Sequence, residues 1–238
     1  MSTMPAVDGL RTDERLAAAG FVAGFTTSAL GSMHEASNRA KALERVGLGG
    51  LPSYLHKQVH GNRVVDLFTK SDQSENVDSP READGWALDK SGRVAVIYAA
   101  DCTPIFIWDK RGRAGAILHS GWKGTQANIA AEGVKALEAK GVMAAEMEAF
   151  IGPRANACCY SVSDDFVNKF RAESLERRGG KLYFDLGKEA KAQLIGVGVI
   201  AANVVVSTDC TVCGSDFYSY RRAKDGTRMM GFLAKRHE

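Results

Sequence analysis

Three apolar segments near the middle of the chain, the last two joined by a tight turn, constrain the fold more than any other feature. Residues 94–99 and 114–118 are short runs dominated by Val, Ile, Leu and Ala, and residues 105–108 extend the pattern. Such runs are typical of strands that are buried on both faces of a sheet. Residues 110–113, Lys-Arg-Gly-Arg, form a hairpin-like turn before the last run. The sequence therefore predicts a central sheet covered on both sides.

The flanking sequence alternates between helical and extended patterns. We expect helices over residues 36–46, 125–140, 163–173 and 188–194. We expect strands over residues 54–59, 64–68, 148–151, 182–186 and 204–207, and an extended pair formed by residues 217–220 and 229–233. Residues 71–81 are polar and rich in Ser, which predicts a mobile surface loop. The hairpin-like connections argue against a purely parallel sheet, so the class is mixed α and β.

The charge balance argues against nucleic acid and membrane partners. The 238 residues carry 31 basic and 28 acidic side chains, a net charge of +3 that is scattered along the chain. The N-terminal residues 1–15 are acidic in part and lack an apolar core, and no window approaches the ~18 apolar residues of a membrane span. We therefore expect a cytoplasmic protein whose five cysteines are thiols.

Three side chains form a candidate metal centre. Cys102 and His119 each appear where a buried strand stops, and His60 stands in a His-Gly-Asn turn that can present its imidazole freely. Adjacent strands that end at one sheet edge would bring Cys102 and His119 together. Two imidazoles and one thiolate suit zinc or copper. Three protein ligands leave one coordination position open, which is the mark of a catalytic rather than a structural zinc site.

The remaining cysteines allow a second interpretation. Cys158-Cys159 and the Cys210-Thr-Val-Cys213 segment contain enough thiolates for a four-cysteine zinc site. Vicinal cysteines paired with one Cys-x-x-Cys segment are a poor version of that spacing. The sequence alone favours packed thiols near the site.

Six ordered motifs carry a resemblance to a known family. They are Lys57-Gln-Val-His-Gly61, Ala83-Asp-Gly85, Ala100-Asp-Cys-Thr-Pro-Ile105, His119-Ser-Gly-Trp-Lys-Gly-Thr125, Ile151-Gly-Pro153 with Cys158-Cys-Tyr160, and Phe217-Tyr-Ser-Tyr-Arg-Arg222. Over about residues 20–235 the chain resembles the laccase-domain family, whose members are described as multicopper polyphenol oxidases, purine nucleoside phosphorylases or peptidoglycan editing factors.

The resemblance implies a fold and a division of the chain. It implies an α+β protein, an α/β/β/α layered sandwich of two related halves with mixed sheets. Residues 1–19 would be a flexible N-terminal segment, and residues 20–238 a laccase-like catalytic domain. The resemblance also implies that His60, Cys102 and His119 are the metal ligands and catalytic residues, with zinc as the metal and copper as the alternative.

The activity that these features favour is a metal-dependent purine nucleoside enzyme. The resemblance implies phosphorolysis of adenosine, inosine or methylthioadenosine, and deamination of adenosine, so the partners would be a small nucleoside and phosphate. Asp84 and Asp101 can orient a ligand or move a proton. Trp122 or Tyr160 can stack on a purine, or be ordinary packed aromatic residues. Fixed cations suit a phosphate dianion, and the candidates are Lys123, Arg154, Arg221 and Arg222.

Other functions stay open at this point. A peptidoglycan-precursor amide hydrolase would use metal-activated water, or Cys102 as nucleophile with His119 as base. A copper-dependent polyphenol oxidase of the conventional multicopper kind needs many more imidazoles than the five histidines of this chain. A metal-binding module without turnover is the third alternative. One departure bears on it, because Ser28 follows Gly24-Phe-Thr-Thr27 where the family usually has an arginine.

Overall fold

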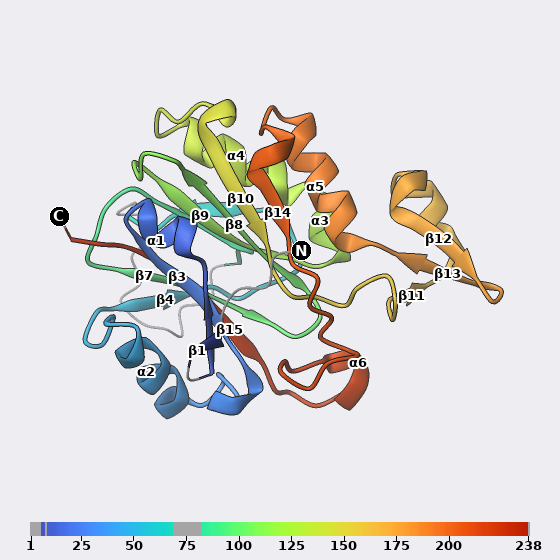
Figure 1. Cartoon of the computed structure of the whole chain (residues 1–238), viewed down its shortest axis with the longest axis horizontal. Helices are drawn as coiled ribbons and strands as arrows, with labels where there is room; N and C mark the ends of the chain where they lie inside the picture. Colours follow the sequence, from blue (N-terminus) through green and yellow to red (C-terminus); the bar gives the residue numbers. More distant parts are fainter. Residues whose placement is uncertain (1–5, 8, 69–81, 238) are drawn as a thin grey trace.

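The computed structural model describes residues 6–7, 9–68 and 82–237, and it is a layered α+β protein. Two six-stranded sheets pack face to face, with α2 (Ala36–Arg45) on the outer side of one and α4 (Ile129–Glu138) and α5 (Leu186–Gly196) on the outer side of the other (Figure 1). This order of layers, helix, sheet, sheet and helix, confirms the fold class that the sequence predicts.

The first sheet is built from both ends of the described chain and from the segment before the candidate ligand Cys102. Its strands lie in the order β1 (Ala6–Val7), β2 (Leu10–Thr12), β3 (Phe21–Thr26), β15 (Met229–Lys235), β7 (Val94–Ala99) and β4 (Ser53–Leu55). All neighbours are antiparallel except β4 and β7. The short helix α1 (Glu14–Ala18) connects β2 to β3. The boundary at residue 20 stays a prediction.

The second sheet has the order β14 (Val204–Val206), β10 (Met147–Ile151), β8 (Thr103–Asp109), β9 (Gly115–Ser120), β6 (Gly85–Leu88) and β5 (Val64–Asp66). Its two outer pairs are parallel and its three inner pairs antiparallel, so the sheet is mixed. The chain passes from the first sheet to the second between β7 and β8, where Cys102 lies.

The core between the sheets follows from alternation along the strands. On β8, Phe106 and Trp108 face the other sheet, while Ile105 and Ile107 pack under α4 and α5. On β7, Ala95 and Ile97 face inward, while Val94 and Val96 pack with Leu43 of α2. Each sheet is therefore buried on both faces, as the apolar runs of residues 94–99 and 114–118 predict.

A small third sheet stands beside the main body (Figure 1). It consists of β11 (Ser161–Val162), β13 (Lys181–Phe184) and β12 (Leu175–Arg178), all antiparallel. Gly179 and Gly180, both with positive φ, form the turn between β12 and β13. Aromatic packing of Phe166, Phe170 and Phe184 joins this sheet to the preceding turns.

Three predicted elements differ from the structure. The helix expected over residues 125–140 is two helices, α3 (Trp122–Gln126) and α4, because Asn128 adopts φ 58° and caps α4 through its side chain. The helix expected over residues 163–173 consists of two 3₁₀ turns, Asp164–Asn168 and Ala172–Ser174.

The extended pair predicted at the C-terminal end is confirmed for residues 229–233, which lie in β15, and wrong for residues 217–220. Tyr220 begins a short helix, α6 (Tyr220–Ala223), and β15 pairs with β3 and β7 instead. The Ser219 side chain accepts a hydrogen bond from the Arg222 amide and so caps α6. This local hydrogen bond favours the helix over extended structure. The loop predicted over residues 71–81 lies outside the described residues.

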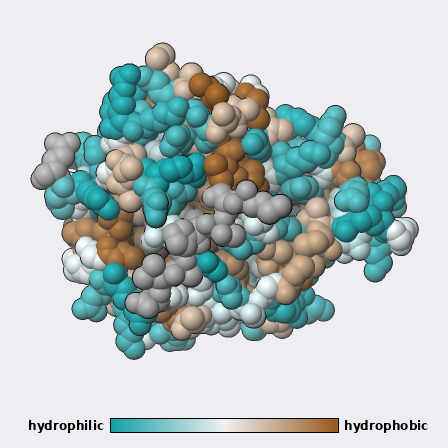
Figure 2. Space-filling model, in the orientation of Figure 1, coloured by the Kyte–Doolittle hydropathy of each residue, from teal (hydrophilic) through white to brown (hydrophobic). Residues whose placement is uncertain are grey.

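Apolar side chains lie mainly inside the molecule. Figure 2 shows a face that is mostly hydrophilic, with hydrophobic residues in separate small patches. Within the described ranges, no helix combines the length and the apolar character that crossing a bilayer requires.

Substitution of Gly24 on β3 tests how closely β2 packs against this strand. A methyl group at Gly24 would lie 2.2 Å from the Arg11 carbonyl oxygen, so Gly24→Ala must push β2 away. We expect the free energy of unfolding to fall by about 2 kcal/mol, measured by urea denaturation. Gly196→Ala in α5 is the matched control, because nothing lies within 4 Å of the place that its added methyl group would take and Ala favours helix. Equal stability of the two variants would contradict this packing.

Candidate metal centre

The three predicted ligands come from separate segments of the chain and lie close together. His60 lies in the turn between β4 and β5, Cys102 lies in the connection from β7 to β8, and His119 lies on β9 opposite Pro104. One ligand atom from each lies within 4.8 Å of the others. The rings of His60 and His119 meet edge to face with centroids 4.9 Å apart. The convergence predicted from the sequence is therefore present.

A buried carboxylate organises two of these side chains. Asp84, immediately before β6, is 1% exposed, and its Oδ1 lies 2.8 Å from His119 Nδ1. The backbone amides of Val59, His60 and Gly61 donate to the same carboxylate at 3.2, 2.9 and 2.7 Å. Burial opposes the charge of Asp84, but these hydrogen bonds outweigh it and lower its pKa.

The Asp84 contacts fix the direction of both imidazoles. An ionised carboxylate accepts from Nδ1–H of His119, so the Nε2 lone pair of that ring is available to a metal. The three amide contacts hold His60 at φ 61°, a left-handed conformation that is uncommon for residues other than glycine. The turn is thus shaped by Asp84 rather than by a glycine at position 60.

Two glycines leave room for this arrangement. A methyl group at Gly121 would lie 2.8 Å from His60 Cδ2 and 3.0 Å from Cys102 Sγ. A methyl group at Gly124 would lie 2.7 Å from the Gly61 carbonyl oxygen. The Gly-x-x-Gly spacing at the start of α3 therefore allows the helix to approach the His60 turn closely.

Cys102 and His119 favour each other's charged forms. Burial raises the pKa of the Cys102 thiol, but the charge of His119 and hydrogen bonds with His119 and His60 lower it to about 6. Burial lowers the pKa of His119, but the Cys102 thiolate and the Asp84 hydrogen bond raise it to about 9. A thiolate held near neutral pH is the form that binds metals or acts as a nucleophile.

The donor set fits a transition metal. One thiolate and two imidazoles match zinc or copper(II), and Asp84 behind His119 is the carboxylate–histidine pair common at such centres. His60, Cys102 and His119 are the residues that would hold the ion. The side of this group away from Asp84 borders a cavity of about 880 Å³.

The cavity is lined by aromatic and basic side chains as well as by the three donors. Tyr98, Trp122, Tyr160 and Tyr220 supply the rings, and Arg221, Lys224 and Arg228 supply the positive charges. The Arg221 guanidinium lies 4.8 Å from the centre of the Tyr160 ring. Such a mixture suits a ligand that has a flat, partly polar group and an anionic group.

Asp84 supports the centre and does not line the cavity; the other predicted substrate-binding residues divide into two sets. Asp101 and Arg221 line the cavity, and Asp101 accepts hydrogen bonds from the Thr211 hydroxyl and the Arg221 amide, both at 2.6 Å. Lys123, Arg154 and Arg222 are not among the described residues that line it.

The second set has other partners. Lys123 is exposed, with its ammonium 5.6 Å from the Trp122 ring centre. Arg154 is buried and donates to the carbonyl oxygens of Gly152 and Ser207, both at 3.0 Å. Arg222 donates to carbonyl oxygens of the preceding loop, including Thr211 at 2.8 Å.

Sequence reasoning missed several residues at the cavity. His34 lines the cavity, and its ring lies 4.9 Å from that of Tyr98. Arg228 reaches the cavity from the segment before β15. The Ser28 hydroxyl donates to the Ser215 carbonyl oxygen at 2.9 Å.

The layered fold and the centre with three donor side chains describe an α+β protein with a candidate metal site. Comparison with known proteins identifies the family to which it belongs. The family model described as multi-copper polyphenol oxidoreductase laccase matches residues 32–236. The chain belongs to this laccase-domain family, as the six motifs predict.

Relatives and solved structures agree with this assignment. The chain is 34% identical over 177 residues to a purine nucleoside phosphorylase of Aquifex aeolicus, covering 74% of this chain and 80% of that protein. It is 30% identical over 178 residues to adenosine deaminase RL5 of an unknown prokaryotic organism, covering 70% and 68%. The crystal structure of YlmD from Geobacillus stearothermophilus superposes with a TM-score of 0.87, at 26% identity and 98% coverage of both chains.

Asp84→Asn tests the support behind the ligands. An amide places an N–H group against the donors of the His60 turn and weakens the hold on His119, so we expect zinc affinity to fall by about 10- to 100-fold. Competition with a chromophoric chelator measures this change, and circular dichroism checks the fold. Asp66→Asn, which removes a carboxylate charge on β5 without touching the centre, is the control. Unchanged zinc affinity in Asp84→Asn would refute the proposed support.

Proposed function

We propose that this protein is a zinc-dependent purine nucleoside enzyme, with His60, Cys102 and His119 as metal ligands. Its reactions would be phosphorolysis of adenosine, inosine or methylthioadenosine, and deamination of adenosine. The observation that carries the proposal is the meeting of two imidazoles and a thiolate on a cavity with aromatic and cationic walls. The names of relatives, purine nucleoside phosphorylase and adenosine deaminase, agree with it.

The ligands have distinct tasks in this proposal. His119 presents Nε2 while Asp84 holds Nδ1–H, and Cys102 supplies the negative charge that balances a divalent ion. A bound zinc ion would supply Lewis-acid activation of water or of a substrate oxygen at its open coordination position. Copper is the alternative ion for the same donor set.

The rings around the cavity suit a purine. Trp122 begins α3 and packs against Phe166, with centroids 5.3 Å apart, so its position is fixed. Burial and the negative charge of Cys102 raise the pKa of Tyr160 to about 12, so its hydroxyl keeps its proton and can donate to a ring nitrogen. Stacking plus one polar contact is a common way to bind a heteroaromatic ring.

The cations of the cavity suit phosphate. Arg221 lies next to Asp101, which accepts from the Arg221 amide and therefore holds this residue at the cavity wall. Arg228 and Lys224 add further charge from the same C-terminal segment. Guanidinium groups bind phosphate oxygens through charge-assisted hydrogen bonds, and they stabilise charge that develops as a glycosidic bond breaks.

A covalent amide hydrolase is the second candidate, favoured by the direct contact of Cys102 with His119. A thiolate with a pKa of about 6 beside an imidazolium can attack a carbonyl carbon. The two candidates differ in their response to chelators, because a cysteine nucleophile keeps its activity when metal is removed. A conventional multicopper oxidase is disfavoured, since the chain has five histidines and His56 is stacked on Trp86 at 3.8 Å.

Replacing each ligand tests the proposal directly. We expect His60→Ala, Cys102→Ala and His119→Ala each to lose bound zinc and nucleoside turnover together, with kcat/KM reduced by about 1,000-fold or more. Zinc is measured by mass spectrometry. Release of purine base and of ammonia from adenosine is measured with and without phosphate, so that phosphorolysis and deamination are separated. A variant that keeps both zinc and turnover would remove that residue from the ligand set.

Arg221→Ala tests the phosphate contact. Because Arg221 is exposed at the cavity wall, we expect KM for phosphate to rise by about three- to tenfold while KM for nucleoside changes less. Arg177→Ala is the control, since Arg177 of the small third sheet pairs with Asp164. An Arg221→Ala enzyme with an unchanged KM for phosphate would place the anion elsewhere.

A further inference from the structure

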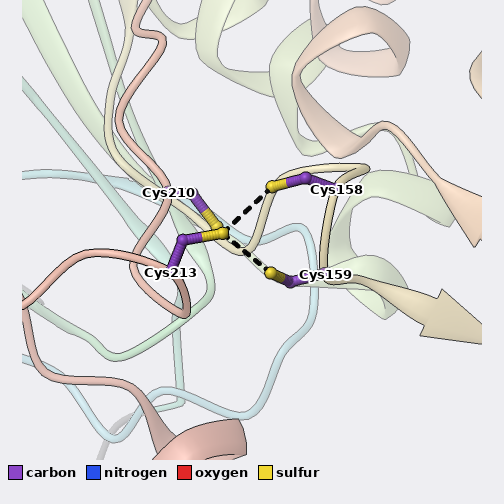
Figure 3. Close-up of side chains that lie close together, drawn as sticks. All are labelled: Cys158, Cys159, Cys210 and Cys213. Atoms are coloured by element: carbon purple, nitrogen blue, oxygen red, sulfur yellow. Dashed lines mark hydrogen bonds between the residues drawn. The ribbon is translucent and has the colours of Figure 1, made fainter.

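Four cysteines outside the candidate metal centre converge on one point (Figure 3). Cys158, Cys159, Cys210 and Cys213 each offer a sulfur atom, and all four atoms lie within 4.8 Å of one another. The Cys213 sulfur lies 3.3 Å from that of Cys158 and 2.9 Å from that of Cys159. The packing that the sequence favoured is thus a true four-sulfur cluster, and the vicinal pair does point to a common centre.

The backbone around the cluster is tied together before any ion is considered. Cys158 and Cys159 lie in the turn after β10, and Cys210 and Cys213 in the turn after its parallel neighbour β14. The Thr211 amide donates to the Arg154 carbonyl at 2.9 Å. The Asn156 side chain donates to the carbonyl oxygens of Thr208 and Asp209 at 3.0 and 3.1 Å. The two turns are therefore held in fixed relative positions.

The grouping of all four sulfurs, rather than the separations of 2.9 and 3.3 Å themselves, favours a shared ion over a disulfide. A tetrahedral zinc ion with Zn–S bonds of about 2.3 Å requires sulfur separations of about 3.8 Å. Covalently bonded sulfurs are about 2.05 Å apart. Cys213 makes close contacts with two cysteines at once, as Figure 3 shows, whereas a disulfide joins one partner and leaves the other unused.

The surroundings favour negative charge on the Cys210 sulfur. The backbone of Asn156, Val212 and Cys213 donates hydrogen bonds to this sulfur. Amides that point at the first cysteine of a Cys-x-x-Cys turn stabilise a sulfur that carries negative charge. Four such sulfurs can lie this close together as thiolates when a cation lies among them.

A buried arginine beside the cluster gives a second indication of negative charge. Arg154 is 4% exposed, and its nearest described carboxylate, Asp185, lies 4.0 Å away and is partly exposed. Its guanidinium packs so closely on α5 that a methyl group at Gly187 would lie 2.2 Å from Nη2. Burial lowers the pKa of Arg154, and the negative charges of Asp185, Cys210, Asp209 and Cys158 oppose this effect. Four thiolates around a divalent ion carry a net charge of about −2, which complements this cation.

We propose that Cys158, Cys159, Cys210 and Cys213 form a second, structural zinc site. The ion would join the turn after β10 to the turn after β14, with four thiolates and no open position, as in other structural zinc sites. This site is separate from the nucleoside chemistry proposed above and does not depend on it.

The site would also support the cavity wall. Thr211, between Cys210 and Cys213, donates its hydroxyl to Asp101, which also accepts from the Arg221 amide. The Ala155 amide donates to the Asp101 carbonyl oxygen at 3.0 Å. Both cysteine turns therefore contact the residue that precedes the ligand Cys102, so loss of the second ion should loosen Asp101 and Arg221.

The test measures zinc in a chain that lacks the first centre. In a Cys102→Ser/His119→Ala background, purified with reductant, we expect one tightly bound zinc ion per chain by mass spectrometry. Adding Cys210→Ser and Cys213→Ser should abolish it. Val212→Ala is the matched control within the same turn, and it should keep the zinc because all four thiols remain. A background chain without zinc would overturn the proposal, and so would zinc retention in the Cys210→Ser/Cys213→Ser variant.

Cobalt substitution tests the site without the serine substitutions, and it therefore applies even if the Cys210→Ser/Cys213→Ser variant does not fold. Removing zinc from the background chain and adding Co²⁺ alone should give the intense thiolate-to-cobalt charge-transfer bands of a four-thiolate tetrahedral site. A spectrum without these bands overturns the proposal. So does an intact mass that shows disulfides in protein kept under reductant. Neither readout involves nucleoside turnover, so failure of the proposed activity and failure of this site are distinguishable.

Discussion

The buried carboxylate of Asp84 is the contact on which the arrangement of the candidate centre depends. It lies where β6 begins, between β5 on one side and β9 on the other. A buried charge is costly unless hydrogen bonds replace its solvation, and here His119 and three backbone amides around His60 do so. The same bonds that satisfy the carboxylate therefore set the positions of two imidazoles. The hydrogen bonds that replace the solvation of the Asp84 carboxylate therefore also pre-organise the centre.

The two-sheet architecture explains why Cys102 lies beside the imidazoles of His60 and His119. The chain leaves β7 in one sheet and enters β8 in the other, and Cys102 lies on this crossing. Asp101 takes φ 80° there, a conformation that non-glycine residues keep when surrounding contacts hold it. Thr211, Ala155 and Arg221 provide those contacts. The crossing that supplies the thiolate is thus braced by the turns that carry the other four cysteines.

The sequence predicted features that depend on local patterns. The apolar strands of residues 94–99 and 114–118, and the placement of Cys102 and His119 at strand ends, follow from alternation and chain breaks. It could not predict features that depend on distant partners. Asn128 interrupts a strongly helical segment because it can adopt a left-handed conformation and cap α4. The cysteine cluster needs the parallel pairing of β10 with β14, which no local spacing reveals.

The neighbouring arginines 221 and 222 show why charge alone did not identify a phosphate site. In α6, successive side chains point in different directions around the axis. Arg221 consequently lies at the cavity, while Arg222 turns back to the carbonyl oxygens of the loop that contains Cys213. One guanidinium is available to a ligand, and the other satisfies backbone acceptors that would lose solvent contact. The C-terminal segment therefore supplies both the charge of the cavity and the stability of its wall.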